Sequence, residues 1–445
     1  MAEPMATLED QAPPREDVLR ARDRLKVIRT RADGRWLRLL WLLSGPGVLV
    51  MLGENDGPSM LSYATTGALY GIGFFVPFIL LTFLMAYVVQ EMTVRLGAAT
   101  HRGHAELIFQ RFGPFWGYFA MADLVFGNLL TLVTEFIAIQ AGGLYFGLQP
   151  AVSVVMGVAL VLASLAMRRY ATWERTLLAL ALGNLLFIPA ALLAHPHPKA
   201  VLHALAFWGP LPGGFNTGFV MLLLANIGAT VTPWMIFFQQ SAVVDKGLTR
   251  ADVTQGRADT AFGSVVAAVA AIATLLAAAP LHAAHVDASQ FNSAADFATA
   301  LRPYLGHAGA AMFALGMIEA GLVAAMTIST SSSYALAETI SARHSMNLDF
   351  HTGRWFYGAA IVSTVLAAAI VLIPGAPLLA MTLAVNVIAT LLMAPALLFL
   401  LLLVNDREIM GGLANGRLAN LAGGAIVIGI AIAGAGYGAM TVFGP

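Results

Sequence analysis

Eleven long apolar segments, separated by short polar stretches, constrain this chain more than any other feature of its sequence. A helix needs about 20 residues to cross the hydrocarbon core of a bilayer, and the segments have about that length or more. Only 11% of the residues are charged, against roughly 25% in a soluble domain. We therefore predict an all-α membrane protein with about 11 transmembrane helices, near residues 39–70, 73–97, 114–144, 149–167, 173–194, 214–244, 259–280, 308–340, 355–374, 376–403 and 420–442.

The polar N-terminus and the remaining composition narrow the class further. Residues 1–38 contain nine Lys or Arg and seven acidic residues, which predicts a cytoplasmic tail with a short surface helix and no cleavable leader. Residues 39–445 would form one transmembrane domain. The chain has no cysteine, which excludes disulfides and thiolate ligands. Its net charge is +0, and without a basic cluster there is no reason to expect a nucleic-acid partner.

The basic residues of the loops fall on one side if the eleven segments alternate in direction. With the N-terminus inside, only Lys199 and Arg302 lie outside. Because cytoplasmic loops are enriched in Lys and Arg, this asymmetry predicts a cytoplasmic N-terminus. The residues on the inner side are Arg95, Arg102, Arg111, Arg168, Arg169, Arg175, Lys246, Arg250, Arg257, Arg343, Arg354, Arg407 and Arg417.

Two of the apolar segments are interrupted by the same pattern, a Gly followed after four residues by a Pro. The first interruption is Gly53–Ser59, which includes Glu54 and Asp56, and the second is Gly228–Trp234. Gly and Pro disfavour a continuous helix, and freed backbone groups are tolerated at membrane depth only inside protein or beside a water-filled cavity. The alternative to a functional break is an ordinary kinked helix whose acidic side chain reaches the membrane surface. Matched interruptions in two halves of a chain instead indicate a transporter binding site.

The two interruptions divide the chain into repeats. The second follows the first by 175 residues, and the segments that contain them run in opposite directions. This predicts an inverted pair of five-helix repeats, about 39–195 and about 214–403, followed by a final helix at about 420–442. Helices 1 and 6 would be broken and would cross near the bilayer midplane.

Several polar residues lie within other apolar segments. Asn128, Thr131 and Glu135 share one helix face in the third segment, because they are spaced three and four residues apart. Glu135 could serve as a cation relay, or as a hydrogen-bonded structural carboxyl. Asn386 stands alone in the tenth segment and could reach the first interruption.

Four stretches resemble the NRAMP family of divalent-metal transporters. The stretch Gly45–Ser59 is similar to the family's first helix, Gly228–Trp234 to its sixth, Thr134–Ile137 to its third, and Asp406–Asn420 to the loop after the tenth. The resemblance covers almost the whole chain after the tail. It implies a LeuT-type 5+5 inverted repeat, and transport of a divalent metal ion by alternating access.

The family's metal-binding positions differ in part from this sequence. Asp56 matches the metal-binding Asp, and Ala229 matches the residue whose carbonyl meets the metal. Ser59 stands where the family has a metal-binding Asn, and Thr232 where it has a Met; Trp234 replaces a His. Gly57 and Pro58 stand in the reverse order of the family's Pro-Gly. Gln239 replaces a second His of the family pattern, and Leu132 replaces an Asp.

These departures favour a hard cation. Thioether sulfur favours soft transition metals, whereas carboxylate, carbonyl and hydroxyl oxygens suit Mg²⁺. Mg²⁺ keeps several of its waters when bound, and Ser59 and Thr232 are smaller than the residues they replace. The pattern is most similar to the magnesium-transporting branch of the family. Drift in a manganese transporter would be the alternative.

We therefore expect a carrier for Mg²⁺, and also for Mn²⁺, in a bacterial inner (plasma) membrane. With Trp234, Gln239 and Leu132 in place of titratable residues, we expect no coupling to protons, and Glu135 is the one acid that could restore it. The partners expected are the ion and the lipid bilayer, with no cofactor and no obligate protein partner. The expected metal-site residues are Asp56, Ser59, Ala229 and Thr232, with Asn386 and Glu135 as weaker candidates and Gly57 and Trp234 shaping the pocket.

Three other functions would fit parts of the pattern. A proton-coupled Mn²⁺ or Fe²⁺ transporter would differ in the ions that compete for uptake. An amino-acid carrier of the same fold is disfavoured because Glu54 and Asp56 would repel a substrate carboxylate. A membrane enzyme is not expected, since the sequence offers no nucleophile–base pair and no His-rich metal motif.

Overall fold

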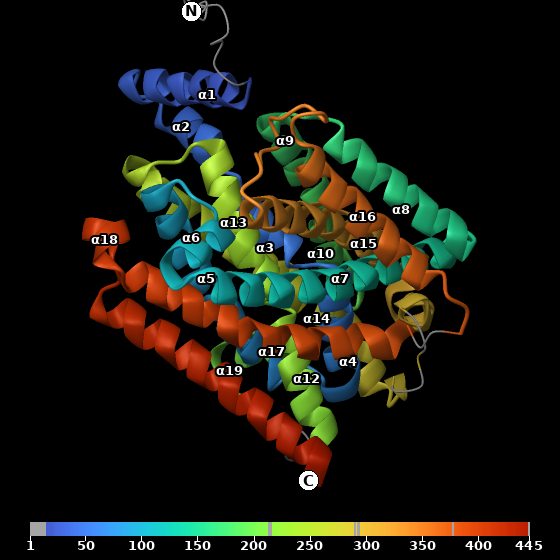
Figure 1. Ribbon diagram of the computed structural model, residues 1–445. Helices are drawn as coiled ribbons and strands as arrows, with labels where there is room; N and C mark the ends of the chain where they lie inside the picture. The colour runs from blue at the N-terminus through green and yellow to red at the C-terminus, as the bar shows by residue number, and fades with distance from the viewer. Residues whose placement is uncertain (1–14, 212–215, 289–290, 292–293, 376–377, 444–445) are drawn as a thin grey trace, which may run out of the picture.

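Helices form every regular element in the part of the chain that the structure describes. The computed structural model describes residues 15–211, 216–288, 291, 294–375 and 378–443 (Figure 1). The helices up to residue 206 are α1 (Arg15–Ala32), α2 (Trp36–Leu43), α3 (Pro46–Gly53), α4 (Gly57–Tyr70), α5 (Phe75–Thr100), α6 (His104–Phe112), α7 (Pro114–Tyr145), α8 (Pro150–Leu165), α9 (Tyr170–Ala181), the 3-10 helix η2 (Leu182–Leu186), α10 (Phe187–Leu193) and α11 (Pro198–Ala206).

The second half of the chain continues with longer helices. They are α12 (Thr217–Gly228), α13 (Pro233–Lys246), η3 (Arg250–Asp252), α14 (Val253–Ala283), α15 (Ala294–Thr339), α16 (Arg354–Val371), α17 (Leu378–Asn405), α18 (Arg407–Met410), η5 (Gly411–Leu413) and α19 (Arg417–Phe443). Within α15 the chain kinks at Gly306, whose φ of 70° lies in the left-handed region that favours glycine.

The predicted apolar segments all coincide with helices. Within the described residues, nine helical units are long and apolar enough to cross a membrane, or ten if α2 and α3, bent by 50°, count as one. Two predicted segments fall outside those nine. Segment 39–70 is broken into α3 and α4, and segment 149–167 corresponds to α8, which has only 16 residues.

Both predicted interruptions break their helices. The first separates α3 from α4 at residues 54–56, and the second separates α12 from α13 at residues 229–232. The four half-helices lie inside the bundle, where α14 packs against α3 and α4, α13 against α5, and α12 against α17. The long helices α7 and α15 pack along one another beside them, and α19 lies on the outside along α17 (Figure 1).

The N-terminal helix α1 lies across one end of the bundle (Figure 1). Ion pairs hold it there: Arg20 contacts Asp245 at 2.7 Å, and Arg24 and Arg31 contact Asp252 at 2.5 and 2.6 Å. The predicted surface helix is therefore present, but it is attached to the C-terminal end of α13 and to η3 instead of extending freely from the bundle.

Candidate functional site

The first break is stabilised by its own acidic residue. Asp56 has an extended backbone, with φ −80° and ψ 175°, and precedes the first turn of α4. Its Oδ1 accepts a hydrogen bond from the backbone N–H of Ser59 at 2.8 Å. Such a side-chain cap satisfies one of the free N–H groups at a helix start. Pro58 follows in the first turn, where its missing N–H costs nothing.

The second break is organised differently and contacts the first directly. Thr232 is extended, with φ −121° and ψ 153°, and Pro233 begins α13. The Thr232 hydroxyl does not cap its own helix but donates to the two Glu54 carboxylate oxygens, at 3.0 and 2.9 Å. Glu54 therefore joins the end of α3 to the start of α13. Because the hydroxyl proton points to Glu54, the Thr232 oxygen keeps its lone pairs for another ligand.

Glu135 reaches the first break from α7. The backbone N–H of Gly57 donates to its Oε2 at 3.0 Å, while its Oε1 has no hydrogen-bond partner in the described residues. The carboxyl groups of Glu135 and Asp56 lie within hydrogen-bonding reach of each other. Position 57 needs glycine, since a Cβ there would collide with the Cβ of Ala138. The inverted Gly-Pro order thus allows α7 to approach the break closely.

Glu54, Asp56 and Glu135 are the charged groups of this site. Their exposed fractions are 0%, 1% and 0%. No salt bridge within the described residues involves any of the three. The charged group that acts on Glu54 is Asp56, and the charged groups that act on Glu135 are Asp56 and Glu54. Buried charges are costly unless they are paired or bind a metal. Three carboxyls in one place therefore require protons or an added cation.

The uncharged candidates surround these acids. The Ala229 carbonyl accepts a hydrogen bond from the Tyr63 hydroxyl at 2.8 Å, and the Ser59 hydroxyl is buried beside the Asp56 carboxyl. Asn386 donates from Nδ2 to Ser62 Oγ at 2.9 Å, which places its amide about one helical turn beyond Ser59 along α4. The site thus combines carboxylate, hydroxyl, carbonyl and amide oxygens from α3, α4, α7, α12, α13 and α17.

Trp234 forms a wall between the two breaks. It is buried, and a Cβ on Gly53 would lie 3.4 Å from its ring. Its carbonyl accepts a hydrogen bond from Ser331 at 3.1 Å. Gln239, five residues after Trp234 in α13, donates to the Thr260 hydroxyl oxygen at 3.1 Å. Leu132 is buried in the apolar core. These three positions hold packing or amide groups that do not titrate near pH 7.

The structure brings the predicted site residues together around the two breaks. Sequence reasoning missed Glu54 as a site residue, although it stands two positions from Asp56, and it missed Tyr63, which carries no pattern in the sequence. In this conformation the site is closed, since Ser59 and Thr232 are only 1% and 2% exposed. Within the described ranges no three His, Cys, Asp or Glu side chains are arranged as a ready metal centre.

Comparison with known families gives one match that covers most of the chain. The model of the natural resistance-associated macrophage protein-like family, Nramp, matches residues 47–437. Similar curated proteins include the divalent metal cation transporters MntH of Pectobacterium carotovorum and Yersinia enterocolitica. The first is 28% identical over 396 residues, covering 87% of this chain and 91% of the relative. The second is 26% identical over 403 residues, covering 88% and 93%.

Solved structures confirm the predicted fold class. The manganese transporter of Eremococcus coleocola superposes with a TM-score of 0.71 at 20% identity, covering 90% of this chain and 86% of the other. A protein named MhsT, solved with L-phenylalanine, superposes with a TM-score of 0.57 at 13% identity, covering 88% and 97%. The all-helical, LeuT-type architecture with broken first and sixth spans is therefore established for this chain.

Proposed function

This chain belongs to the natural resistance-associated macrophage protein-like family, and from that premise we propose that it carries a divalent metal cation across a membrane. The observation that supports this most strongly is the cluster of Glu54, Asp56 and Glu135, three buried carboxyls that have no basic partner among the residues the structure describes. A cation of charge two would compensate most of this cluster. The relatives named divalent metal cation transporters agree with this proposal.

We propose Mg²⁺ as the main substrate and Mn²⁺ as an accepted second ion. Asp56 would supply the principal charged ligand, and Ser59, the Ala229 carbonyl and Thr232 would supply neutral oxygens, directly or through water. All of these are hard ligands, as Mg²⁺ prefers. The buried Ser59 hydroxyl beside Asp56 and the free lone pairs of Thr232 support this assignment.

Glu54, Glu135 and Asn386 would act around these ligands. Glu54 orients the Thr232 hydroxyl and adds negative charge beside it. Glu135 holds the N–H of Gly57 and faces Asp56, and Asn386 positions α17 against α4. Trp234 would close the pocket on the side of Gly53.

Transport would proceed by alternating access around the two breaks. In the closed conformation the half-helices α3, α4, α12 and α13 surround the site and exclude water. Movement of one pair of half-helices would open the site to one side of the membrane at a time. The N-terminus would lie in the cytoplasm of a bacterial cell, because the basic loops then face inward.

We propose that this movement is not coupled to protons. Trp234, Gln239 and Leu132 stand where the resemblance places titratable residues of the sixth and third helices, and none of the three titrates near neutral pH. The membrane potential alone supplies about 2.3 kcal/mol per elementary charge for each 100 mV. A divalent cation gains twice that amount, which is sufficient to drive uptake down its electrochemical gradient.

One observation favours a second candidate, a proton-coupled Mn²⁺ or Fe²⁺ carrier. The Asp56 and Glu135 carboxyls lie within hydrogen-bonding reach, and a hydrogen bond between two carboxyl groups requires a proton on one of them. A metal ion that binds Asp56 would displace such a proton.

The test is ion uptake into liposomes that contain the purified protein. Mg²⁺, Mn²⁺ and Ca²⁺ uptake are measured side by side, with each ion also offered as a competitor of the others. We expect saturable Mg²⁺ uptake, competition by Mn²⁺, and reduced uptake in Glu54→Gln, because the site loses a negative charge while Thr232 keeps an acceptor oxygen. Uptake of Mn²⁺ that excess Mg²⁺ does not inhibit would reject the magnesium proposal.

A further inference from the structure

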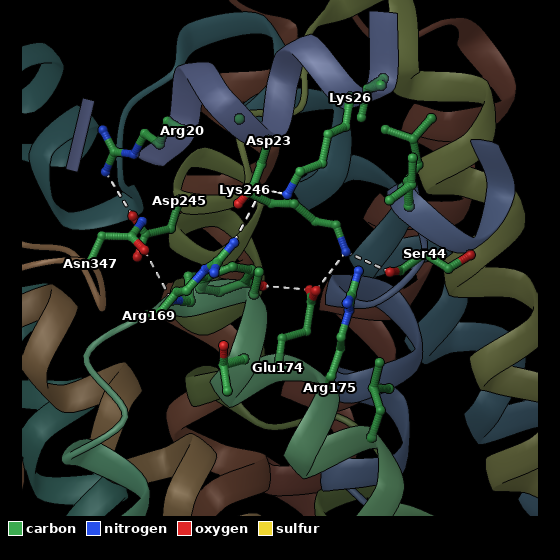
Figure 2. Close-up of a pocket in the computed structure, with 18 of the residues that line it drawn as sticks. Arg20, Asp23, Lys26, Ser44, Arg169, Glu174, Arg175, Asp245, Lys246 and Asn347 are labelled. Carbon is green, nitrogen blue, oxygen red and sulfur yellow. Dashed lines mark hydrogen bonds and ion pairs between the residues drawn. The ribbon is translucent and has the colours of Figure 1, made fainter. Parts of the chain in front are cut away.

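A cavity of about 510 Å³ lies at the end of the molecule that carries α1. Figure 2 shows its walls, which come from α1, the end of α2, the first turns of α9 and the C-terminal end of α13. None of the residues at the two helix breaks lines it. The cavity is therefore separate from the proposed ion site, and the ion site does not account for it.

Basic side chains outnumber acidic ones in this cavity by six to three. The acidic residues already have partners: Asp245 accepts from Arg20 at 2.7 Å, Glu174 from Lys246 at 2.7 Å, and Asp23 from Lys26 at 2.6 Å. The lining thus contains more cationic than anionic side chains, and each carboxylate already has a cationic partner. The cavity as a whole is therefore positively charged.

Arg175 supplies the unpaired charge. In Figure 2 its side chain points into the cavity beside Lys246, and no interaction is drawn to it. It forms no salt bridge or hydrogen bond within the described residues, and it is exposed. Arg169, on the opposite wall, contacts Asp23 at 3.5 Å, a longer distance than the other ion pairs of this cavity. An Arg guanidinium offers several N–H donors that fit a phosphate group well.

The other wall of the cavity is apolar. Trp41, Leu42 and Leu178 line it, and Trp41 is 67% exposed. The same surface continues over α2 with Trp36 and Leu37, which are 64% and 66% exposed. Tryptophan is enriched where a protein meets the headgroup level of a bilayer. The cavity thus has one basic wall and one wall that continues onto a surface suited to acyl chains.

We propose that this cavity binds the headgroup of an anionic phospholipid. The phosphate would lie between Arg175, Lys26 and Lys246, and the acyl chains would lie along Trp41 and the exposed face of α2. Basic clusters at the membrane surface attract anionic lipids, and the apolar wall favours a lipid over a free phosphate ion. A bound lipid would hold α1 against α9, and through the Arg20–Asp245 pair it would also hold the end of α13.

The test uses native mass spectrometry of the purified full-length protein in detergent. Phosphatidylglycerol, phosphatidylcholine and inorganic phosphate are added separately, and the bound fraction is measured. The test variant is Lys26→Gln with Arg175→Gln, and the matched control is Arg22→Gln with Arg29→Gln, two exposed residues of α1 that do not line the cavity. Both variants remove two positive charges, so long-range attraction changes equally.

We expect wild type and the control to retain phosphatidylglycerol in preference to phosphatidylcholine. Each cation removed from the cavity should weaken phosphatidylglycerol binding about fivefold. Equal loss in both variants would show a diffuse charge effect and overturn the proposal. So would equal retention of both lipids by wild type, or inorganic phosphate displacing phosphatidylglycerol at the same concentration. Monodispersity and thermal stability of each variant, measured in the same detergent, separate lost binding from lost folding.

Discussion

Three buried carboxyl groups lie near the two helix breaks at the centre of this molecule. Glu54, Asp56 and Glu135 come from different places in the sequence and have no basic partner in the described part of the chain. Each accepts a hydrogen bond from a neutral group, namely Thr232, the N–H of Ser59 or the N–H of Gly57. Neutral donors position carboxylates without cancelling their charge, which leaves the charge for a cation.

Thr232 provides a test of the preference for hard cations. Replacing it in Thr232→Met removes a hard oxygen and supplies a soft sulfur, so preference should move from Mg²⁺ toward Mn²⁺ and Cd²⁺. We expect the Mn²⁺/Mg²⁺ ratio of uptake rates to rise by about tenfold, equivalent to about 1.4 kcal/mol. Thr232→Ser serves as the control, because it keeps the hydroxyl and should keep the ratio. An unchanged ratio in Thr232→Met would place Thr232 away from the ion.

A second prediction concerns His104, at the start of the short helix α6. Burial lowers the pKa of His104 from 6.5 to about 4, although Nδ1 lies 2.8 Å from Gln240 Oε1. Between pH 6.5 and pH 4 the imidazole is protonated in the unfolded chain but neutral in the folded chain. The free energy of unfolding therefore decreases as the pH falls below 6.5. At pH 5 the loss is about 2 kcal/mol. His104→Gln should therefore show a smaller decrease in melting temperature between pH 7.5 and pH 5 than wild type, and an equal decrease would contradict this.

Broken helices are the elements that create the site. Each break places a helix end inside the bundle, where backbone groups that a continuous helix would satisfy become available. The starts of α4 and α13 meet there, and α7 supplies Glu135 from the side. The close approach of α7 to α4 is possible because position 57 has no Cβ.

Gly57→Ala tests this packing between α4 and α7. The added Cβ would overlap Ala138, so α7 must shift and Glu135 must lose its bond to the Gly57 N–H. Overpacking of this kind costs about 1 to 3 kcal/mol, and we expect Mg²⁺ uptake to fall at least several-fold. Adding Ala138→Gly should restore uptake. If the double variant stays as slow as the single one, the defect arises from the backbone of residue 57 and not from this contact.

The helices and both breaks were predictable from the sequence, whereas part of the site was not. Apolar length and the repeated Gly-to-Pro spacing depend on residues that are neighbours in the chain, and all eleven segments coincide with helices. The contact of Glu54 with Thr232 joins residues 178 positions apart, and no local pattern specifies it. The attachment of α1 through Arg20 and Asp245 is likewise a long-range contact that charge composition alone did not indicate.

At the scale of the whole molecule, the structure is a closed conformation of a carrier fold. The two breaks are shielded from solvent, while ion pairs attach α1 to the end of α13 and to η3 at one end of the bundle. Alternating access requires these half-helices to move relative to α7 and α15. A carrier of this kind couples ion movement to protons only if a group in the site exchanges one.

The whole-molecule prediction is that Mg²⁺ entry does not acidify the vesicle interior. A pH-sensitive dye is enclosed in proteoliposomes, and a potassium gradient with valinomycin clamps the voltage. Because Trp234, Gln239 and Leu132 do not titrate near pH 7, the dye signal should stay constant during Mg²⁺ or Mn²⁺ uptake. Metal-dependent acidification that disappears in Glu135→Gln would instead support proton coupling through Asp56 and Glu135.

The most direct test of the proposed ion site is Mg²⁺ uptake by Asp56→Asn compared with Asp123→Asn. Both changes remove one carboxylate from a membrane helix, but Asp56 caps α4 at the break whereas Asp123 lies on α7 three turns before Glu135. In matched proteoliposomes, with folding checked by size-exclusion chromatography, we expect Asp56→Asn to abolish saturable Mg²⁺ uptake and Asp123→Asn to retain it. Normal rate and affinity in Asp56→Asn would contradict the assignment of the ion site to the two helix breaks.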